Sequence, residues 1–172
     1  MIDELLYLLF SAAALVIAFY SIDRKFVKKN KLCIEGKLVW TDEGRQTKPF
    51  FNNDYGVLGK PDLMYKIKGG ILAVEYKSRK GEIYESDIVQ TKCASLAARG
   101  SGYKVIRFLV ITSTQKQYYD LPRSDKALYK EIEPYIVYTR QAKSGSKLPA
   151  TPGRFKCKSC AFNYKCTYVQ ED

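Results

Sequence analysis

Three charged side chains, placed on two predicted neighbouring strands, could together form a metal-dependent catalytic site. Asp62 follows Gly59-Lys60-Pro61, and Glu75 and Lys77 lie two residues apart further along the chain. Side chains two apart in a strand share one face, and Gly69-Gly70 suits the tight turn of a hairpin that would bring Asp62 close to Glu75. Two adjacent carboxylates favour a cation such as Mg²⁺ or Mn²⁺ between them. A lysine beside that cation could orient water and offset charge on a phosphate.

The same triplet also fits the solvated face of an ordinary hairpin. Two further features favour the catalytic interpretation. Gln90 lies near the start of the next predicted helix, where it could face the same point. A set of cysteines near the end of the chain supplies the second feature.

The elements that must position these residues indicate an α/β domain. Hydrophobic patterning and turn residues predict strands over 58–68 and from Ile71 onward, and a helix from Asp87 to Arg99 with Ser86 as its N-cap. They also predict an interior strand over 104–112, an edge strand over 117–121, and a helix over 126–138 that begins at Ser124 and is bent or broken near Pro134. Residues 35–40 suggest a short strand, and 41–56 suggest loops. The expected fold is a mixed sheet flanked by helices.

Composition narrows the classes of function. The chain has 172 residues and a formal net charge of +11, which favours a polyanionic partner such as nucleic acid or an anionic membrane surface. It contains no histidine, which excludes a Ser-His-Asp triad, a Cys-His pair and histidine-ligated zinc. Among 14 tyrosines, Tyr76 and Tyr84 could stack a base, although core packing is the commoner role of a tyrosine.

An apolar run over residues 5–20 precedes the predicted domain. As a helix it would be about 24 Å long, slightly short of a usual membrane span. Acidic residues come before it and a basic stretch follows it, a pattern that opposes a signal peptide and predicts a single-pass anchor with the rest of the chain in the cytoplasm. The alternative is a helix buried in the core or against a partner.

Cysteines near the end of the chain have a spacing typical of a metal centre. Cys157 and Cys160 form a C-x2-C pair, and Cys166 follows. Three thiolates leave such a centre one ligand short, and Cys33 could supply the fourth, as zinc or an iron–sulfur cluster requires. Spacing does not separate zinc from iron–sulfur. Cys93, on the apolar face of a predicted helix, is expected to be a buried core thiol.

Together, these motifs resemble those of the RecB-like PD-(D/E)XK nucleases that carry an iron–sulfur cluster. The resembling residues are Gly59-Lys60-Pro61-Asp62, Glu75-Tyr76-Lys77, Gln90, and the single early cysteine with the later C-x2-C-x5-C. The overall likeness is greatest to the CRISPR-associated RecB-like exonucleases, and it spans about 33–166. It divides the chain into an apolar helix with a basic flank (1–31), a nuclease core (32–142) and a linker with the cysteine segment (143–172).

The resemblance implies divalent-metal-dependent cleavage of DNA, usually at single-stranded ends, by a protein that can act with the CRISPR integrase complex. It assigns Asp62, Glu75 and the backbone carbonyl of Tyr76 to Mg²⁺ or Mn²⁺. Lys77 would position water or stabilise charge on the phosphate, and Gln90 would orient the lysine or contact the DNA backbone. A [4Fe–4S] cluster would act as a structural staple, held by four ligands: Cys33, Cys157, Cys160 and Cys166.

The chain departs from the family pattern in several places. The metal-binding histidine that usually lies on a helix before the aspartate motif is missing, and neither Glu35 nor Glu43 is a strong candidate to replace it. The tyrosine usual four residues after the motif glutamine is Ala94. Two alternatives therefore stay open: a degenerate nuclease-like protein that binds DNA or docks to a DNA-processing complex, and a zinc-stapled membrane adaptor.

Overall fold

The computed structural model describes residues 34–42, 47–149, 153, 157–158, 160–161 and 163–166. The predicted apolar helix over 5–20 and Cys33 lie outside these residues, so the anchor and the fourth cluster ligand stay predictions. Within the described part of the chain, no helix is both long and apolar enough to cross a membrane.

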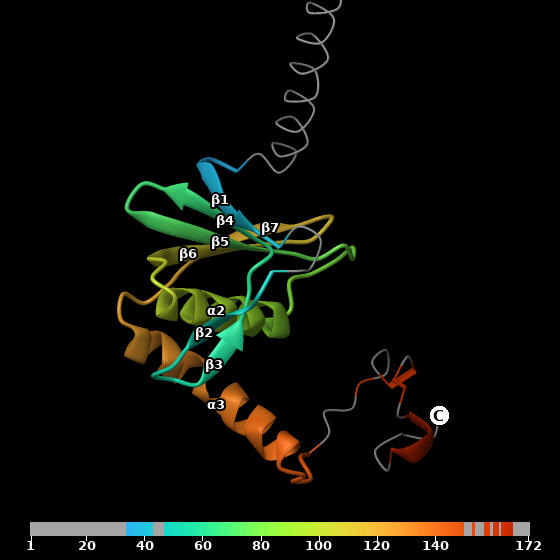
Figure 1. The fold of residues 1–172 in the computed structure, drawn as a ribbon. Helices are drawn as coiled ribbons and strands as arrows, with labels where there is room; N and C mark the ends of the chain where they lie inside the picture. Colours follow the sequence, from blue (N-terminus) through green and yellow to red (C-terminus); the bar gives the residue numbers. More distant parts are fainter. Residues whose placement is uncertain are drawn as a thin grey trace, which may run out of the picture.

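A five-stranded mixed sheet forms the centre of the described domain (Figure 1). Its strands, in spatial order, are β1 (Lys37–Thr41), β4 (Leu63–Ile67), β5 (Gly70–Tyr76), β6 (Val105–Ile111) and β7 (Lys116–Asp120). β5 and β6 are parallel, and every other pair is antiparallel. The parallel pair requires a crossover, and α2 (Glu85–Gly100) supplies it. The α/β class and the mixed sheet are thus confirmed.

Both long helices cover the same face of this sheet. Figure 1 shows α2 directly beneath the strands and α3 (Asp125–Lys143) on the far side of α2. Their contact with the sheet is a single apolar cluster in which Met64 and Phe108 of the strands meet Leu96 of α2 and Leu128 and Ile132 of α3, all fully buried. Because α2 is pressed between the sheet and α3, its position along the strands is fixed.

The opposite face of the sheet carries a second apolar cluster. Tyr65, Leu72, Val74 and Leu109 are buried in it. β6 therefore contributes Phe108 to one cluster and Leu109 to the other, as a strand that is buried on both faces must. The prediction of an interior strand here is confirmed.

The segment between β1 and β4 contains a second, small sheet that the sequence did not predict. Phe50–Asn52 forms β2, where a loop was expected, and it pairs antiparallel with β3 (Val57–Gly59). The expected strand over 58–68 is in fact two strands, β3 and β4, separated at Lys60 and Pro61. Proline has no N–H to donate to a ladder, so the pairing changes partner at that point.

The predicted start of α2 and the predicted end of α3 were wrong, whereas the end of α2 and the start of α3 were close to the prediction. α2 begins at Glu85 with Tyr84 as the N-cap, rather than at Asp87 after Ser86. α3 runs unbroken through Pro134 and continues to Lys143. Ser124 does cap α3, since its hydroxyl accepts a hydrogen bond from the Ala127 N–H at 3.1 Å.

A buried amide ties the small sheet to α2, which gives a stability test. Asn52 is 2% exposed, and its Nδ2 donates to the Leu96 carbonyl at 3.0 Å. We expect Asn52→Asp to lower the free energy of unfolding by about 3 kcal/mol, because a carboxylate would face that carbonyl without water. The neighbouring Asn53 is exposed, so Asn53→Asp is the matched control and should change stability little. Equal losses in denaturant unfolding would contradict this account.

Candidate active site

The register of the β4–β5 hairpin places Asp62 beside Glu75. Leu63 pairs with Val74, and the Asp62 N–H continues the ladder by donating to the Val74 carbonyl at 3.0 Å. The next opposed pair is therefore Asp62 and Glu75, and directly opposed side chains lie on the same face of a sheet. Asp62 Oδ2 also accepts the Tyr76 N–H at 2.7 Å, which fixes its carboxylate at the end of β5.

Lys77 and Gln90 converge on the Glu75 carboxylate from two different elements. Lys77 Nζ lies 2.7 Å from Glu75 Oε1 and 2.8 Å from Gln90 Oε1, and Gln90 Nε2 donates to Glu75 Oε1 at 2.9 Å. The Lys77 N–H donates to the Ile111 carbonyl at 2.7 Å, which extends the pairing of β5 with β6 beyond Tyr76. The structure thus brings the four predicted catalytic residues together on the α2 side of the sheet.

The second oxygen of Glu75 has no hydrogen-bond partner. Glu75 is 3% exposed, and its Oε2 is buried and unpartnered. Burial raises the pKa of Glu75 above that of an ordinary glutamate; the hydrogen bond from Lys77 opposes this shift, and the nearby Asp62 charge adds to it. A buried oxygen that lacks a partner costs free energy unless a donor or cation meets it. The Asp62 and Glu75 oxygens are hard donors of the kind Mg²⁺ and Mn²⁺ prefer, so the residues fit such an ion.

The third predicted metal ligand, the backbone carbonyl of Tyr76, lies in the chain between Glu75 and Lys77 and stays a prediction. The Tyr76 side chain is 46% exposed, and the Tyr76 N–H is used by Asp62. Within the described residues, no group of three or more Cys, Asp or Glu side chains is placed to hold a metal ion. The candidate site therefore contains two carboxylates rather than three.

An ion pair behind Lys77, unforeseen from the sequence, links the site to the start of α2; its carboxylate is buried and its guanidinium is partly exposed. Asp87 is 4% exposed, forms an ion pair with Arg79, accepts the Tyr84 N–H at 2.8 Å, and lies 4.0 Å from Lys77 Nζ. Burial alone would raise the pKa of Asp87, but the Arg79 and Tyr84 hydrogen bonds hold it below the usual value. Because Asp87 is already paired, it supports the lysine and the helix rather than offering a metal ligand. In the sequence, the sign of this contact is the spacing: an acidic residue three positions after the N-cap can accept the N–H of the N-cap residue. Tyrosine is an unusual N-cap, so the spacing from Tyr84 to Asp87 did not stand out.

Two of the places where this sequence differs from the nucleases that it resembles can be located in the structure. Ala94 is 2% exposed, and a Cβ added at Gly59 would lie only 3.1 Å from the Ala94 Cα, so α2 and the motif loop are in close contact. A tyrosine at Ala94 would not fit this contact. Before Gly59, the described residues contain strands and no helix that could carry the missing histidine. Glu43 lies outside the described residues.

Asp42 is a further carboxylate next to the site. Its N–H donates to the Asp62 carbonyl at 3.0 Å. Its side chain, however, is paired with Lys60 Nζ at 2.7 Å and also accepts the Thr47 hydroxyl. These hydrogen bonds lower the pKa of Asp42 below its usual value, with Lys60 the larger cause. Asp42 thus anchors the lysine of the motif loop.

The three C-terminal cysteines follow α3 in the chain and take part in a succession of tight turns. Cys160 N–H donates to the Cys157 carbonyl, Asn163 N–H to Cys160, and Cys166 N–H to Asn163, each at 3.1 Å. The Gly153 N–H donates to Cys157 Sγ at 3.4 Å. Cys157, Cys160 and Cys166 are free thiols, as is Cys93 on α2, which is half-buried. Burial raises the pKa of Cys93, as expected for a core thiol.

Comparisons with known proteins do not assign this site. No family model matches the chain, and no curated protein matches it. Nine chains of known structure are similar to it. One of them is described as "Crystal structure of SSO0001" and is 13% identical to this chain. The match covers 90% of this chain and 70% of the known structure, with a TM-score of 0.37. Similarity at this level carries no argument, so the site must be judged on its own geometry.

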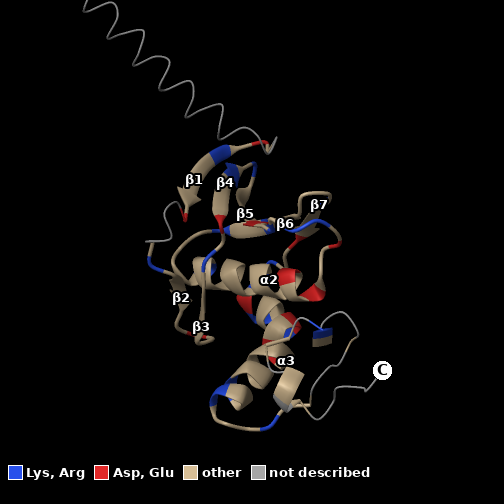
Figure 2. Cartoon of the chain, turned by 90° about the vertical axis from the view of Figure 1, so that its right-hand side faces the viewer, with Lys and Arg blue, Asp and Glu red and all other residues tan. Residues whose placement is uncertain are grey.

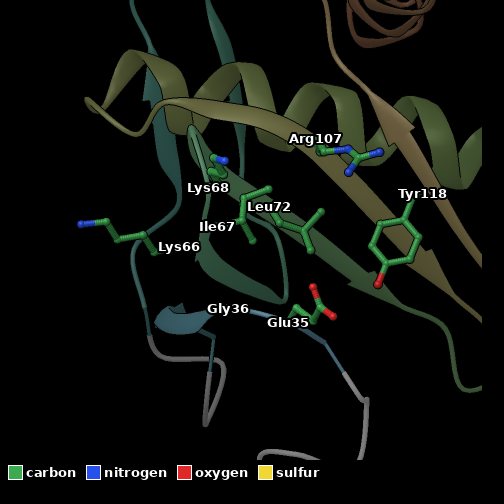
Figure 3. Close-up of a pocket in the computed structure, with 8 residues that line it drawn as sticks. All are labelled: Glu35, Gly36, Lys66, Ile67, Lys68, Leu72, Arg107 and Tyr118. Carbon is green, nitrogen blue, oxygen red and sulfur yellow. The ribbon is translucent and has the colours of Figure 1, made fainter.

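A separate cavity lies on the opposite face of the sheet, away from the candidate site (Figure 3). It has a volume of about 630 Å³ and is lined by Glu35, Lys66, Leu72, Arg107 and Tyr118, among others. Leu72 belongs to the cluster on the face that α2 does not cover. Glu35 is therefore not placed to replace the missing histidine.

The raised pKa of Glu75 gives a pH-dependent test of the metal site. A carboxyl whose pKa is raised by folding contributes most to the free energy of unfolding below its unfolded pKa, and this contribution is lost as pH rises through the folded pKa. In chelator, Glu75→Gln should therefore gain stability relative to wild type as pH rises from acid to neutral. Mn²⁺ should raise the unfolding temperature of wild type but not of Glu75→Gln.

Glu131→Gln is the control for this measurement. Glu131 is a partly exposed carboxylate on α3 that pairs with Lys92 of α2 at 2.8 Å. Its removal should leave both the pH dependence and the Mn²⁺ effect as in wild type. Equal stabilisation of Glu75→Gln and wild type by Mn²⁺ would show that Glu75 is not a ligand.

Proposed function

We propose that the chain is a divalent-metal-dependent DNA nuclease of the PD-(D/E)XK type that acts on single-stranded ends. The observation that carries the proposal is the unpartnered, buried Oε2 of Glu75 beside Asp62, with Lys77 and Gln90 both bonded to the other oxygen. If these residues were only charges on a solvated surface, Glu75 would be exposed, and Lys77 would not be held between Glu75 and Gln90. The net charge of +11 favours a polyanionic substrate.

Each residue of the site has a role that its contacts support. Asp62 and Glu75 would hold Mg²⁺ or Mn²⁺, which when bound supplies Lewis-acid activation of the phosphate and lowers the pKa of water. Lys77 brings a positive charge to the same point and can orient a water or stabilise charge that develops on the phosphate. Gln90 holds Lys77 and Glu75 in their relative positions. Asp87 and Arg79 keep the start of α2, and with it Gln90, against the end of β5.

The C-terminal cysteines are proposed to hold a [4Fe–4S] cluster together with Cys33. The succession of tight turns and the Gly153 N–H bonded to Cys157 Sγ are features that favour metal-bound thiolates, since hydrogen bonds to sulfur tune such sites. The cluster would tie the start of the domain to its end. Zinc bound by the same thiols is the alternative.

A catalytically degenerate DNA-binding protein is the second candidate function. The observation that favours it is the presence of two carboxylates, rather than a group of three ligands, among the described residues. Such a protein would keep its DNA affinity without turnover. The assay below separates the two.

Removal of Lys77 should abolish cleavage with little loss of fold. In Mn²⁺ with end-labelled single-stranded DNA, we expect Lys77→Ala and Glu75→Ala to cleave at least about 10²-fold more slowly than wild type, because charge on the phosphate loses its stabilisation or its metal. Lys92→Ala is the charge-matched control: Lys92 lies on α2 but pairs with Glu131 of α3 rather than with the site residues, so the rate of this variant should stay near that of wild type.

The outcomes of this assay distinguish the candidates. Wild-type cleavage with loss in the two site variants supports the nuclease. DNA binding by wild type without turnover in any divalent cation supports the degenerate protein. Cleavage by Lys77→Ala at the wild-type rate would rule out the proposed catalytic site.

The cluster proposal predicts a coloured protein whose colour depends on specific cysteines. Anaerobically purified wild type should show iron–sulfur absorbance, and Cys157→Ser or Cys160→Ser should reduce it strongly, because the cluster loses a thiolate. Cys93→Ser is the matched control, since Cys93 packs in the helix interface and should leave the absorbance unchanged. A colourless, zinc-containing protein would overturn the iron–sulfur assignment.

A further inference from the structure

Tyr84 presents an exposed aromatic ring at the edge of the candidate site. The residue is 53% exposed, although it is the N-cap of α2. Its backbone is fixed on both sides: its N–H donates to Asp87 Oδ2 at 2.8 Å, and its carbonyl accepts the N–H groups of Asp87 and Ile88 at 3.0 and 3.3 Å. The ring is thus carried by a rigid helix start rather than by a mobile loop.

One face of this ring is already supported by a cation. The Arg79 guanidinium lies 4.5 Å from the ring centroid, and Arg79 is itself held by Asp87 and by the Glu82 carbonyl at 3.2 Å. A guanidinium on one side of a tyrosine fixes the ring and leaves the other side available for stacking. A pre-positioned aromatic ring loses little entropy when it binds a flat ligand.

The ring and the metal-binding residues belong to one connected network. Asp87 contacts Arg79 and Tyr84 directly and lies 4.0 Å from Lys77 Nζ, which in turn contacts Glu75. Tyr84 is thus joined through Asp87 and Lys77 to the place where a cation held by Asp62 and Glu75 would bind a phosphate, and the group next to that phosphate would be the one to meet the ring. In a nucleotide, that group is a sugar with its base.

Charges around the ring favour a base over a phosphate. Glu85 is in the first turn of α2, and Glu82 comes two residues before Tyr84 in the chain. Figure 2 shows acidic segments in red on α2. Glu85 accepts a hydrogen bond from the Tyr135 hydroxyl, which holds it close to the start of the helix. Arg79, the cation beside the ring, is already paired with Asp87, so Glu82 and Glu85 disfavour a phosphate there, whereas Lys77 and a bound cation attract it to the metal site. Phosphate and base are thus directed to different parts of the site.

We propose that Tyr84 is a nucleobase-stacking subsite that selects unpaired DNA. The inference rests on the proposed function, because it assumes a phosphate at Asp62 and Glu75. A base in a duplex is stacked and paired on both sides and cannot present its face to the ring, whereas an unpaired base can. Arg79 acts as a positioning residue beneath the ring.

Short DNA carrying the fluorescent base 2-aminopurine near its end tests this subsite. Binding is measured with Ca²⁺ as the cation, and the DNA is checked for cleavage after each run. Wild type should quench the fluorescence of the single strand by stacking. Tyr84→Leu should lose the quenching and raise Kd for the single strand by about 5- to 100-fold, the range expected for one base–aromatic stack, with Kd for the matching duplex unchanged. Tyr84→Phe and Tyr84→Trp keep a ring and should retain the quenching.

The chain provides a matched control on its other face. Tyr118 is also an exposed tyrosine (43%), lies 5.9 Å from the Arg107 guanidinium, and that arginine is paired with Asp120 at 2.6 Å. It lies in the cavity of Figure 3, away from the candidate site. Tyr118→Leu removes an equivalent ring and should leave quenching and Kd as in wild type.

The outcomes separate this inference from the proposed function. Unchanged quenching in Tyr84→Leu, or equal losses for single strand and duplex, would overturn the subsite even if wild type cleaves DNA. Quenching that depends on Tyr84 in a wild type that never cleaves would support the subsite and overturn the nuclease. A wild type that neither binds nor quenches single-stranded DNA would overturn both.

Discussion

The burial of the Glu75 carboxylate is the constraint on which the rest of the site depends. Glu75 lies at the end of a strand with its side chain under α2, where an ionised oxygen without a partner is costly. The surrounding structure offsets part of this cost, because Lys77 and Gln90 both bond to Oε1. The other oxygen, Oε2, stays buried without a partner near the Asp62 charge. A buried carboxylate with hydrogen bonds to only one of its two oxygens lowers the stability of the fold. The same arrangement suits a site that binds a cation.

This constraint explains why several separate elements meet at one point. The hairpin register sets Asp62 opposite Glu75, the parallel pairing of β5 with β6 carries Lys77 one residue past the strand, and α2 must be pressed against the sheet for Gln90 to reach them. The close approach of Gly59 to Ala94 and the bond from Asn52 to the Leu96 carbonyl hold the helix there. The packing of α2 therefore positions the chemistry.

The sequence predicted those parts of the site that depend on local periodicity. The two-residue spacing of Glu75 and Lys77, the Gly-Gly turn and the offset of Gln90 were enough to bring these residues together with Asp62. It did not predict features set by contacts distant in the chain. Asn52 is a turn-forming residue locally, yet it lies in a strand because its amide bonds to α2. Tyr84 caps α2 in place of Ser86 because Asp87, held by Arg79, turns back to the Tyr84 N–H.

Titration of Mn²⁺ into chelator-treated protein, with free Mn²⁺ followed by electron paramagnetic resonance, tests the central claim most directly. Three chains should be compared: wild type, Asp62→Asn and Asp42→Asn. Asp42 is the matched control, because its carboxylate lies close by but is occupied by Lys60. If Asp62 and Glu75 form the metal site, wild type and Asp42→Asn will bind Mn²⁺ alike, and Asp62→Asn will bind it much more weakly. Equal binding by Asp62→Asn and wild type, or no binding by any of the three, would contradict the account.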